Sequence, residues 1–409
     1  MHKRVLMIAF HYPPCAGSSG LQRALKFSRY LPEEGWQPLV LSASPRAYPQ
    51  TSQEQLAEIP ADLVVKRSFC VDAARHLSLA GRYPRRLALP DRWASWRWSG
   101  VRAGLRLIEE FRPTMIWSTY PIATAHLIAG RLQRASRLPW IADFRDSMTE
   151  PGYPSDPVQR RQYLDIERLA CENARAVVFS APGALRMYAE RYPHLAADHW
   201  VEIPNGYDDL NFPAGDEAGP GTGKVTLLHS GVIYPSERDP THFFDALAQM
   251  KARAMIRSPE FRVVLRATGH DGILAPMIEA RGLGDIVTLA PPIAYTDALR
   301  EMKAASGLLL FQASNCNHQI PAKLYEYMRA GRPVLGLTDP AGDTAVTMRR
   351  TGLTNIVRLD DQADIVTGLG EFLDELRSGR GRYPDAAAVA GYSRRRQTTR
   401  LAELFDRLL

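Results

Sequence analysis

The sequence predicts an α/β protein with two parallel sheets, and three observations lead to this fold class. Apolar runs of strand length alternate along the chain with segments of helical spacing, the pattern of parallel strands joined by crossover helices. At 409 residues the chain is too long for one ordinary hydrophobic core. A stretch rich in Gly, Pro and Asp near the middle of the chain has no apolar periodicity, as expected of an interdomain linker.

The elements of the first half follow from these patterns in chain order. Apolar runs and helical spacing predict a strand at 5–10, a helix at 21–31, strands at 38–42 and 115–118, a helix at 123–135, a strand at 140–143, a helix at 157–173 and a strand at 176–180. Each helix has the length needed to cross between two neighbouring parallel strands.

The second half repeats the alternation. The patterns predict a strand at 225–233, a helix at 241–254, strands at 262–267, 286–289 and 307–311, a helix within 320–331, a buried strand at 334–337 and an amphipathic helix at 391–409. We therefore expect an N-terminal domain at residues 1–205, a linker at 206–224, a C-terminal domain at 225–385 and a terminal helical segment at 386–409.

Composition is that of a globular protein, with 45% hydrophobic and 23% charged residues. The four cysteines are far apart and form no C-x-x-C pair, which favours a reducing compartment and argues against a structural metal. The apolar run that follows Arg4 is too short for a signal peptide, and no run has the length of a transmembrane helix. We expect a cytoplasmic protein.

The most informative segment for function is IPAKLYEYMRAG at residues 320–331. Pro321 suits a first helical turn, and Gly331 suits the helix end. Lys323 and Glu326 are three residues apart and so share one helix face. A helix N-terminus favours anions, so a cation in its first turn indicates a phosphate ligand, with a carboxylate beside it for ribose hydroxyls. The alternative is an ordinary Lys–Glu surface pair.

This segment, extended to IPAKLYEYMRAGRPVL, resembles the donor-site signature of retaining glycosyltransferases of family 4, which have the GT-B fold. Other segments are similar to that family in the expected order: FHYPPCAGSSGLQRALKFSRYLPEEGWQPLVLS near the N-terminus, PWIADFRDSM at 139–148, IPNGYD at 203–208 and LLHSGVIYPSERDP at the start of the second half. Each motif alone is weak, but the ordered set is specific and covers nearly the whole chain.

The resemblance implies two Rossmann-like domains that face a central cleft, with the final helix crossing back to the first domain. It implies transfer of a sugar from a UDP- or GDP-sugar to a saccharide, which we expect to be lipid-linked, in polysaccharide or glycoconjugate assembly. The departing diphosphate would accept the acceptor's proton on the face it leaves, so that configuration is retained. No cofactor is expected, because the chain contains no Asp-x-Asp pair to hold a metal on the diphosphate.

The donor site is expected in the second half. Glu326 would bind the ribose, while Lys323 and Arg238 would stabilise the diphosphate beside Gly231. The family often has Arg directly after this glycine, but Val232 stands here, and Arg238 could instead be a solvated loop charge. His318 occupies the position of the family's first glutamate and is expected to contact the donor sugar.

A second group of candidates lies in the first half. Gly17, in a loop between a strand and a helix, offers backbone N–H groups to a phosphate, unless it only permits a tight turn. Asp143, Arg145 and Asp146 follow an apolar strand and could support charge at the reacting centre. Arg145 stands where the family often has His and cannot act as a base near neutral pH. The alternative for this group is a structural Asp–Arg pair.

The segment Arg82–Arg106 contains seven arginines and one acidic residue, with three tryptophans between them. This mixture suits an anionic membrane surface, and we expect peripheral binding at the inner face of a membrane. No nucleic-acid-binding motif accompanies it, so no nucleic acid partner is expected. The alternative is a buried aromatic cluster covered by arginine side chains.

Two other functions compete with glycosyl transfer. An epimerase of the same fold would act on the nucleotide-sugar itself and needs carboxylates and a His around the sugar. A catalytically silent GT-B protein that binds a partner enzyme would fit the missing Arg and the missing first Glu. Retention of Lys323 and Glu326 favours the transferase.

Overall fold

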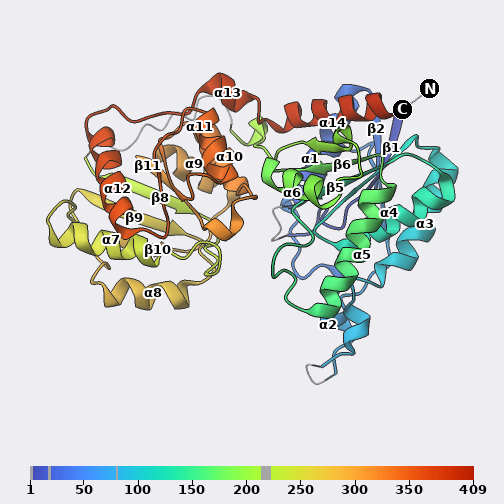
Figure 1. Cartoon of the computed structure of the whole chain (residues 1–409), viewed down its shortest axis with the longest axis horizontal. Coiled ribbons are helices and arrows are strands. Elements are labelled where there is room, and N and C mark those ends of the chain that lie inside the picture. The colour runs from blue at the N-terminus through green and yellow to red at the C-terminus, as the bar shows by residue number, and fades with distance from the viewer. Residues whose placement is uncertain (1–2, 17–19, 80–81, 213–222) are drawn as a thin grey trace. The chain divides into compact units, whose positions relative to one another are not determined.

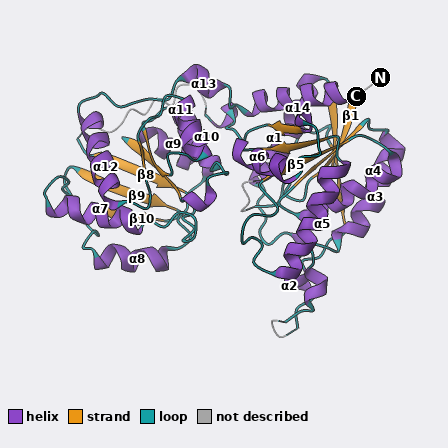
Figure 2. Ribbon diagram, in the orientation of Figure 1, coloured by secondary structure: helices purple, strands orange, loops and turns teal. Residues whose placement is uncertain are grey.

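The fold was analysed in a computed structural model, which describes residues 3–16, 20–79, 82–212 and 223–409. The chain forms two compact units, one comprising Met1–Pro204 with Arg394–Leu409 and the other Asn205–Ser393 (Figure 1). The expected linker at 206–224 lies largely outside the described residues. Each unit is an α/β body around its own parallel sheet, as coloured by secondary structure in Figure 2.

The first unit contains a seven-stranded sheet in the order β3-β2-β1-β4-β5-β6-β7, with every neighbouring pair parallel. The strands are β1 Lys3–Ile8, β2 Trp36–Ala43, β3 Val64–Ser68, β4 Met115–Thr119, β5 Trp140–Arg145, β6 Ala176–Phe179 and β7 Trp200–Glu202. The first six follow the strand order of a doubly wound Rossmann sheet, whose direction of winding reverses between β1 and β4.

Helices cover both faces of this sheet. They are α1 Gly20–Tyr30, α2 Ala73–His76, α3 Trp96–Phe111, α4 Ala123–Ser136, α5 Pro157–Asn173, α6 Pro182–Arg191 and α14 Arg394–Leu408. Alternate residues of β1 enter two cores: Leu6 and Ile8 pack with α3 and α4, whereas Val5 and Met7 pack with α1 and α14. The packing of α14 on α1 confirms the expected return of the final helix to the first half of the chain.

The second unit repeats the architecture with a six-stranded parallel sheet in the order β10-β9-β8-β11-β12-β13. The strands are β8 Val225–Ser230, β9 Phe261–Arg266, β10 Val287–Ala290, β11 Gly307–Gln312, β12 Val334–Thr338 and β13 Ile356–Val357. The helices are α7 Thr241–Ala252, α8 Asp271–Ala280, α9 Tyr295–Ala304, α10 Ala322–Ala330, α11 Asp343–Arg350, α12 Gln362–Arg377 and α13 Ala386–Ala390. The winding direction here reverses between β8 and β11.

The expected fold class is confirmed, with three differences in detail, one of which is that strands β3, β7 and β13 were not predicted. The terminal segment 386–409 contains two helices, of which α13 belongs to the second unit and α14 to the first. Several helices, including α3 and α9, were not predicted, because their polar faces obscure the apolar spacing. Among the described residues, no helix is both long enough and apolar enough to cross a bilayer.

Candidate functional site

The carboxyl ends of the strands at the reversal points are where open α/β sheets bind ligands. In the second unit this location is occupied by the loop that follows β8 and by the N-terminus of α10. Most of the predicted donor-site residues lie on these two segments.

Helix α10 begins without a side-chain cap. Pro321 precedes its first turn, no acidic residue lies in that turn, and Gly331 ends the helix in the left-handed conformation with φ 68°. The backbone N–H groups at this end therefore present partial positive charge that no carboxylate of the first turn neutralises.

Lys323 places an amino group in the first turn of the same helix. The side chain is largely buried, and its Nζ lies 3.0 Å from Nε2 of His229 in β8. A Cβ on Gly231 would lie 3.0 Å from the same nitrogen, so this glycine, with φ 113°, leaves room for the ammonium. Burial and the charge of Arg238 lower the pKa of Lys323 well below its usual range, and Glu326 opposes them.

Arg238 is the second cation of this group. Its Nη1 donates to the carbonyl of Val232 at 2.7 Å, and its guanidinium lies 5.1 Å from the ring centroid of Tyr234. Its Nε is buried and has no hydrogen-bond partner among the described residues. Two cations that repel each other beside an uncapped helix end form a strongly electropositive locus, which a bound anion would relieve.

Glu326 lies one turn further along α10 and accepts a hydrogen bond of 2.7 Å from the hydroxyl of Tyr295, the first residue of α9. Tyr327, the next residue of α10, accepts a hydrogen bond of 2.8 Å from the backbone N–H of Ser230 and so fixes the end of β8. His318 lies in the turn before α10 and is partly buried. The structure thus groups Lys323 and Arg238 at one helix end, with Glu326 on the same helix.

In the first unit, Asp143 does not face an open site. Its side chain is fully buried, and both carboxylate oxygens accept hydrogen bonds from Arg23 on α1, the shortest at 2.8 Å. The Thr119 hydroxyl donates to the same carboxylate at 2.9 Å. This is a structural Asp–Arg pair, but its arginine is Arg23 and not the neighbouring Arg145.

Arg145 and Asp146 pair with each other at the end of β5, with Nη2 of the arginine 2.6 Å from the carboxylate. Arg145 has φ 53°, unusual for a residue with a side chain, and the pairing of β5 with β6 is irregular at this point. A Cβ on Gly20 would overlap the Arg145 guanidinium, which therefore lies against the start of α1. Gly17 lies outside the described residues.

His11, in the loop that follows β1, also belongs to this neighbourhood. Burial, reinforced by the charge of Arg145, lowers the pKa of His11 to about 3. The imidazole is therefore neutral at physiological pH and can serve as a hydrogen-bonding group there, whereas a permanent cation role is excluded for it.

In the segment Arg82–Arg106, some side chains are buried in the core of the first unit and others are exposed on its surface. Trp96 is fully buried, and its Nε1 donates to Ser68 at 2.8 Å, whereas Trp98 is 60% exposed and stacks against Arg97. Arg85 is paired with Asp156. Exposed residues recur at helical spacing along the outer face of α3, namely Trp98, Arg102, Leu105 and Arg106, followed by Glu109 and Glu110 in its last turn.

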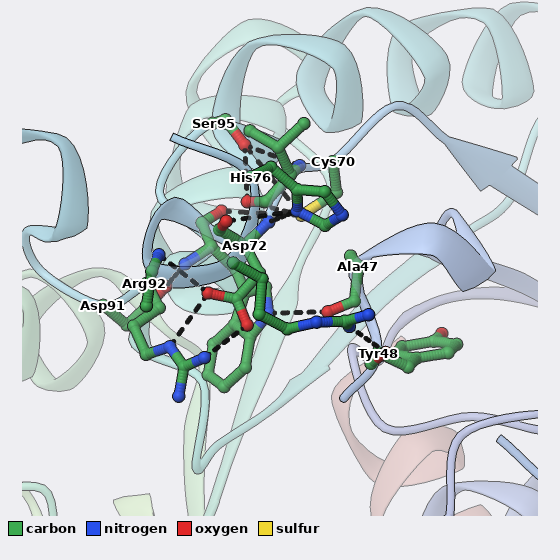
Figure 3. A network of polar contacts seen from close by, with 12 residues as sticks. Ala47, Tyr48, Cys70, Asp72, His76, Asp91, Arg92 and Ser95 are labelled. Atoms are coloured by element: carbon green, nitrogen blue, oxygen red, sulfur yellow. Dashed lines mark hydrogen bonds and ion pairs between the residues drawn. The ribbon is translucent and has the colours of Figure 1, made fainter. Parts of the chain in front are cut away.

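A polar network fixes the beginning of this segment (Figure 3). Asp72 is fully buried and receives two hydrogen bonds from Arg92, of 2.9 and 2.5 Å. The indole of Trp93 donates to the carbonyl of Ala47 at 3.0 Å, and the backbone N–H of Trp93 donates to Asp91 at 3.0 Å. These residues are therefore part of the folded core of the first unit.

Asp91, Arg92 and Trp93 form part of one wall of a hollow of about 580 Å³ in the first unit. The other walls come from the turn after β4 and from the start of α5. Three aromatic side chains and two arginines line the hollow, namely Tyr83, Trp93, Tyr163, Arg85 and Arg92. Aromatic faces and fixed guanidinium groups together suit a ligand with both apolar faces and polar groups.

Sequence reasoning missed three residues of the second-unit group: His229, Tyr295 and Tyr327. His229 was detectable in principle, because it is a polar residue at the end of an otherwise apolar strand, two residues before Gly231. Tyr295 gave no local signal, since only the packing of α9 beside α10 brings it to Glu326. Among the described residues, no cluster of His, Cys, Asp and Glu could hold a metal ion.

Comparisons with known proteins bear on the fold and on the family of the first half of the chain. Residues 20–206 match the family model of the glycosyl transferase 4-like domain. None of the curated protein sequences matches the chain significantly.

Solved structures resemble the chain over nearly its whole length. Sucrose-phosphate synthase from Thermosynechococcus elongatus has a TM-score of 0.70 at 16% identity, covering 99% of each chain. HepE from Anabaena, in complex with UDP and glucose, has a TM-score of 0.69 at 14% identity, covering 99% of this chain and 100% of HepE. The lipopolysaccharide outer core galactosyltransferase WaaB has a TM-score of 0.65 at 13% identity, covering 98% and 99%. At these identities the likeness establishes the GT-B fold.

Proposed function

We propose that this chain, whose residues 20–206 are a glycosyl transferase 4-like domain on the GT-B fold, transfers a sugar from a nucleotide diphosphate donor to a saccharide with retention of configuration. One observation supports the proposal: Lys323, in the first turn of the uncapped helix α10, interacts electrostatically with Arg238, and Gly231 leaves space beside the ammonium. A diphosphate is the ligand class that two cations and a helix end would hold together.

The roles of the remaining donor-site residues follow from their positions. Glu326 would accept hydrogen bonds from the ribose, with Tyr295 steadying one of its oxygens. His318, before α10, would contact the donor sugar. The HepE structures solved with UDP and with UDP-glucose make a UDP-sugar the first donor to test, with GDP-sugars as the alternative.

In the reaction, the bond between the anomeric carbon and the diphosphate oxygen breaks, and a bond to the acceptor oxygen forms on the same face. The acceptor's proton passes to the departing diphosphate. Lys323, Arg238 and the helix end would stabilise the charge that develops on the diphosphate, the main contribution expected of a preorganised electropositive site. The positive groups are protein groups, so we propose that turnover is independent of a metal ion.

The acceptor would bind in the first unit. The hollow beside Trp93 and Tyr163 offers aromatic faces for sugar rings, and Arg85 and Arg92 offer fixed donors to its polar groups. Arg145 and Asp146, at the end of β5, would act on the reacting hydroxyl or the departing group. Asp143 would support them indirectly, because its side chain is buried against Arg23.

We propose further that the acceptor is lipid-linked and that the protein binds the inner face of a membrane. The outer face of α3 supports this, because Trp98 and Leu105 lie beside Arg102 and Arg106 on exposed surface. Amphipathic surfaces of this composition bind anionic lipid interfaces reversibly.

The deciding experiment is a thermal-shift panel of UDP-, GDP-, ADP- and dTDP-sugars, followed by product analysis with the donor that binds. A ligand present at a hundred times its Kd adds about 2.7 kcal/mol to the free energy of unfolding. The transferase is expected to form glycosylated acceptor with retained configuration. Conversion of the donor's sugar without acceptor would identify an epimerase, and no binding by any donor would favour the catalytically silent alternative.

A further inference from the structure

His229 is a fully buried histidine next to the proposed diphosphate site, and the mechanism above gives it no role. It lies near the end of β8, with its ring 5.0 Å from the ring of Phe311 in β11. A buried histidine in such a place is usually a core residue whose two nitrogens are satisfied by neighbours. Besides a backbone contact with Gly231, its two ring nitrogens have partners of different kinds, and this difference between Leu309 and Lys323 supports the inference.

The first partner fixes the tautomer of the imidazole. Nδ1 lies 2.9 Å from the carbonyl oxygen of Leu309, which can only accept, so Nδ1 carries the hydrogen. The sheet itself enforces this contact, because β8 and β11 are hydrogen-bonded neighbours with Leu228 opposite Leu308. Burial and the charge of Lys323 lower the pKa of His229 well below its usual range, so the ring is neutral.

The second partner is the ammonium of Lys323. With Nδ1 protonated and the ring neutral, Nε2 has a lone pair and no hydrogen, and the ammonium, 3.0 Å away, donates to it. The sheet fixes the position of the Nε2 lone pair. A lysine side chain by itself is flexible and carries three N–H donors, so this fixed acceptor restricts where the ammonium lies. Repulsion from Arg238 and from the start of α10 would otherwise drive the ammonium away from this location.

We propose that His229 is a positioning residue, which holds the Lys323 ammonium by one of its three N–H groups and aims the other two at the donor diphosphate. This inference rests on the proposed function, because it assigns the diphosphate to Lys323. It predicts that His229 affects the binding of a nucleoside diphosphate but leaves the binding of a nucleoside unchanged.

Two substitutions separate the two hydrogen bonds of the ring. His229→Asn places an amide N–H near the position of Nδ1 and keeps the bond to Leu309, but leaves Lys323 without its acceptor. His229→Gln can place an amide oxygen near the position of Nε2 and so restores an acceptor for Lys323. Both changes remove the ring from the core, so each variant is a control for the packing defect of the other.

The probes are UDP and uridine, with Kd measured by calorimetry on the full chain and with melting temperatures recorded for each variant. His229→Asn is expected to raise the Kd for UDP by about 10- to 100-fold, as one charge-assisted hydrogen bond implies, with uridine unchanged. His229→Gln is expected to recover most of the affinity. In a Lys323→Met background, His229→Asn is expected to have no further effect, because the interaction it removes is already absent.

Equal affinities of the Asn and Gln variants for UDP, or additive effects of His229→Asn and Lys323→Met, would overturn the positioning role. If both His229 variants fail to fold, nitrogen NMR of the wild-type protein decides: the inference requires Nδ1 to be protonated and Nε2 to respond to UDP. An Nε2-protonated ring would overturn it. Failure of wild type to bind UDP, GDP or ADP would instead contradict the proposed function, so the two failures are distinguishable.

Discussion

Arg23 on α1 and Asp143 on β5 form a two-pronged ion pair with both side chains at most 1% exposed. The pair ties the first helix of the chain to the strand whose last residue is Arg145, and Arg23 also donates to the carbonyl of Pro204 at the end of the first unit's main segment. The Asp143 carboxylate therefore has a structural role, although Arg145 and Asp146, which follow it closely in the sequence, are candidates for the site. This arrangement leads to the first of five predictions.

Asp143→Asn is expected to destabilise the protein by about 3–5 kcal/mol, because it leaves the Arg23 charge buried without its counter-ion. Urea unfolding of the first unit measures the change. Arg23→Met/Asp143→Leu is the matched control and is expected to recover much of the loss, since it removes both charges. A change below about 1 kcal/mol for Asp143→Asn, together with a large fall in turnover, would return Asp143 to a direct catalytic role.

Glu326→Ala is expected to lower donor affinity by orders of magnitude while the protein stays folded. A carboxylate that accepts hydrogen bonds from two ribose hydroxyls makes interactions of about 1.5–3 kcal/mol each. Tyr295→Phe is the control, because it removes the hydroxyl that steadies Glu326 and keeps the carboxylate. Calorimetry with the donor measures both variants, and wild-type affinity in Glu326→Ala would remove the ribose assignment.

Turnover is expected to survive EDTA, because Lys323, Arg238 and the end of α10 supply the positive charge at the diphosphate. The measurement is initial rate in EDTA against rate with added Mg²⁺ or Mn²⁺. Loss of activity on chelation that a divalent ion restores would show that the charge assignment is wrong. In that case Lys323→Ala would reduce turnover less than the structure implies.

Donor affinity is expected to fall as pH rises above the pKa of Lys323 in the free protein. Burial and Arg238 lower the pKa of Lys323 in the free protein, and an anionic diphosphate raises it again in the complex. Binding therefore takes up a proton once pH exceeds the free-protein pKa, and Kd rises by at most about tenfold per pH unit. Calorimetry over a series of pH values tests this, with Lys323→Met expected to show weaker binding and no such dependence on pH.

Binding to anionic vesicles is expected to depend on the outer face of α3. Each basic residue near such a surface contributes about 1 kcal/mol and is screened by salt, so Arg102→Glu/Arg106→Glu should abolish sedimentation with phosphatidylglycerol vesicles at low salt. Arg349→Glu/Arg350→Glu on α11 is the control with the same change of charge. Equal binding by both variants, or no binding by wild type, would contradict membrane docking through α3.

Local sequence was sufficient for the elements whose signals are local. The helix Pro157–Asn173 was predicted from its helical spacing with the bounds that the structure shows, and its start is fixed by Pro157 in the first turn and by Asp156, which accepts from the backbone of Gln159. Ten of the thirteen strands were predicted, because parallel strands buried on both faces are continuously apolar, whereas the partly exposed β3 and the short β7 and β13 were missed. Lys323 and Glu326 were identified for a similar reason. They are three residues apart on one helix, and this spacing places them on the same helix face.

Tertiary structure alone decided which charged and aromatic residues are available to ligands. Asp143 and Asp146 are equivalent by sequence, yet the first is paired with Arg23, 120 positions away, and the second with its neighbour. Trp96 and Trp98 are likewise alike in sequence, but the rotation of α3 buries one and exposes the other. The tautomer of His229 depends on a carbonyl in β11, 80 residues further along. Such outcomes depend on which distant groups share a buried volume, and local patterns carry no information about that.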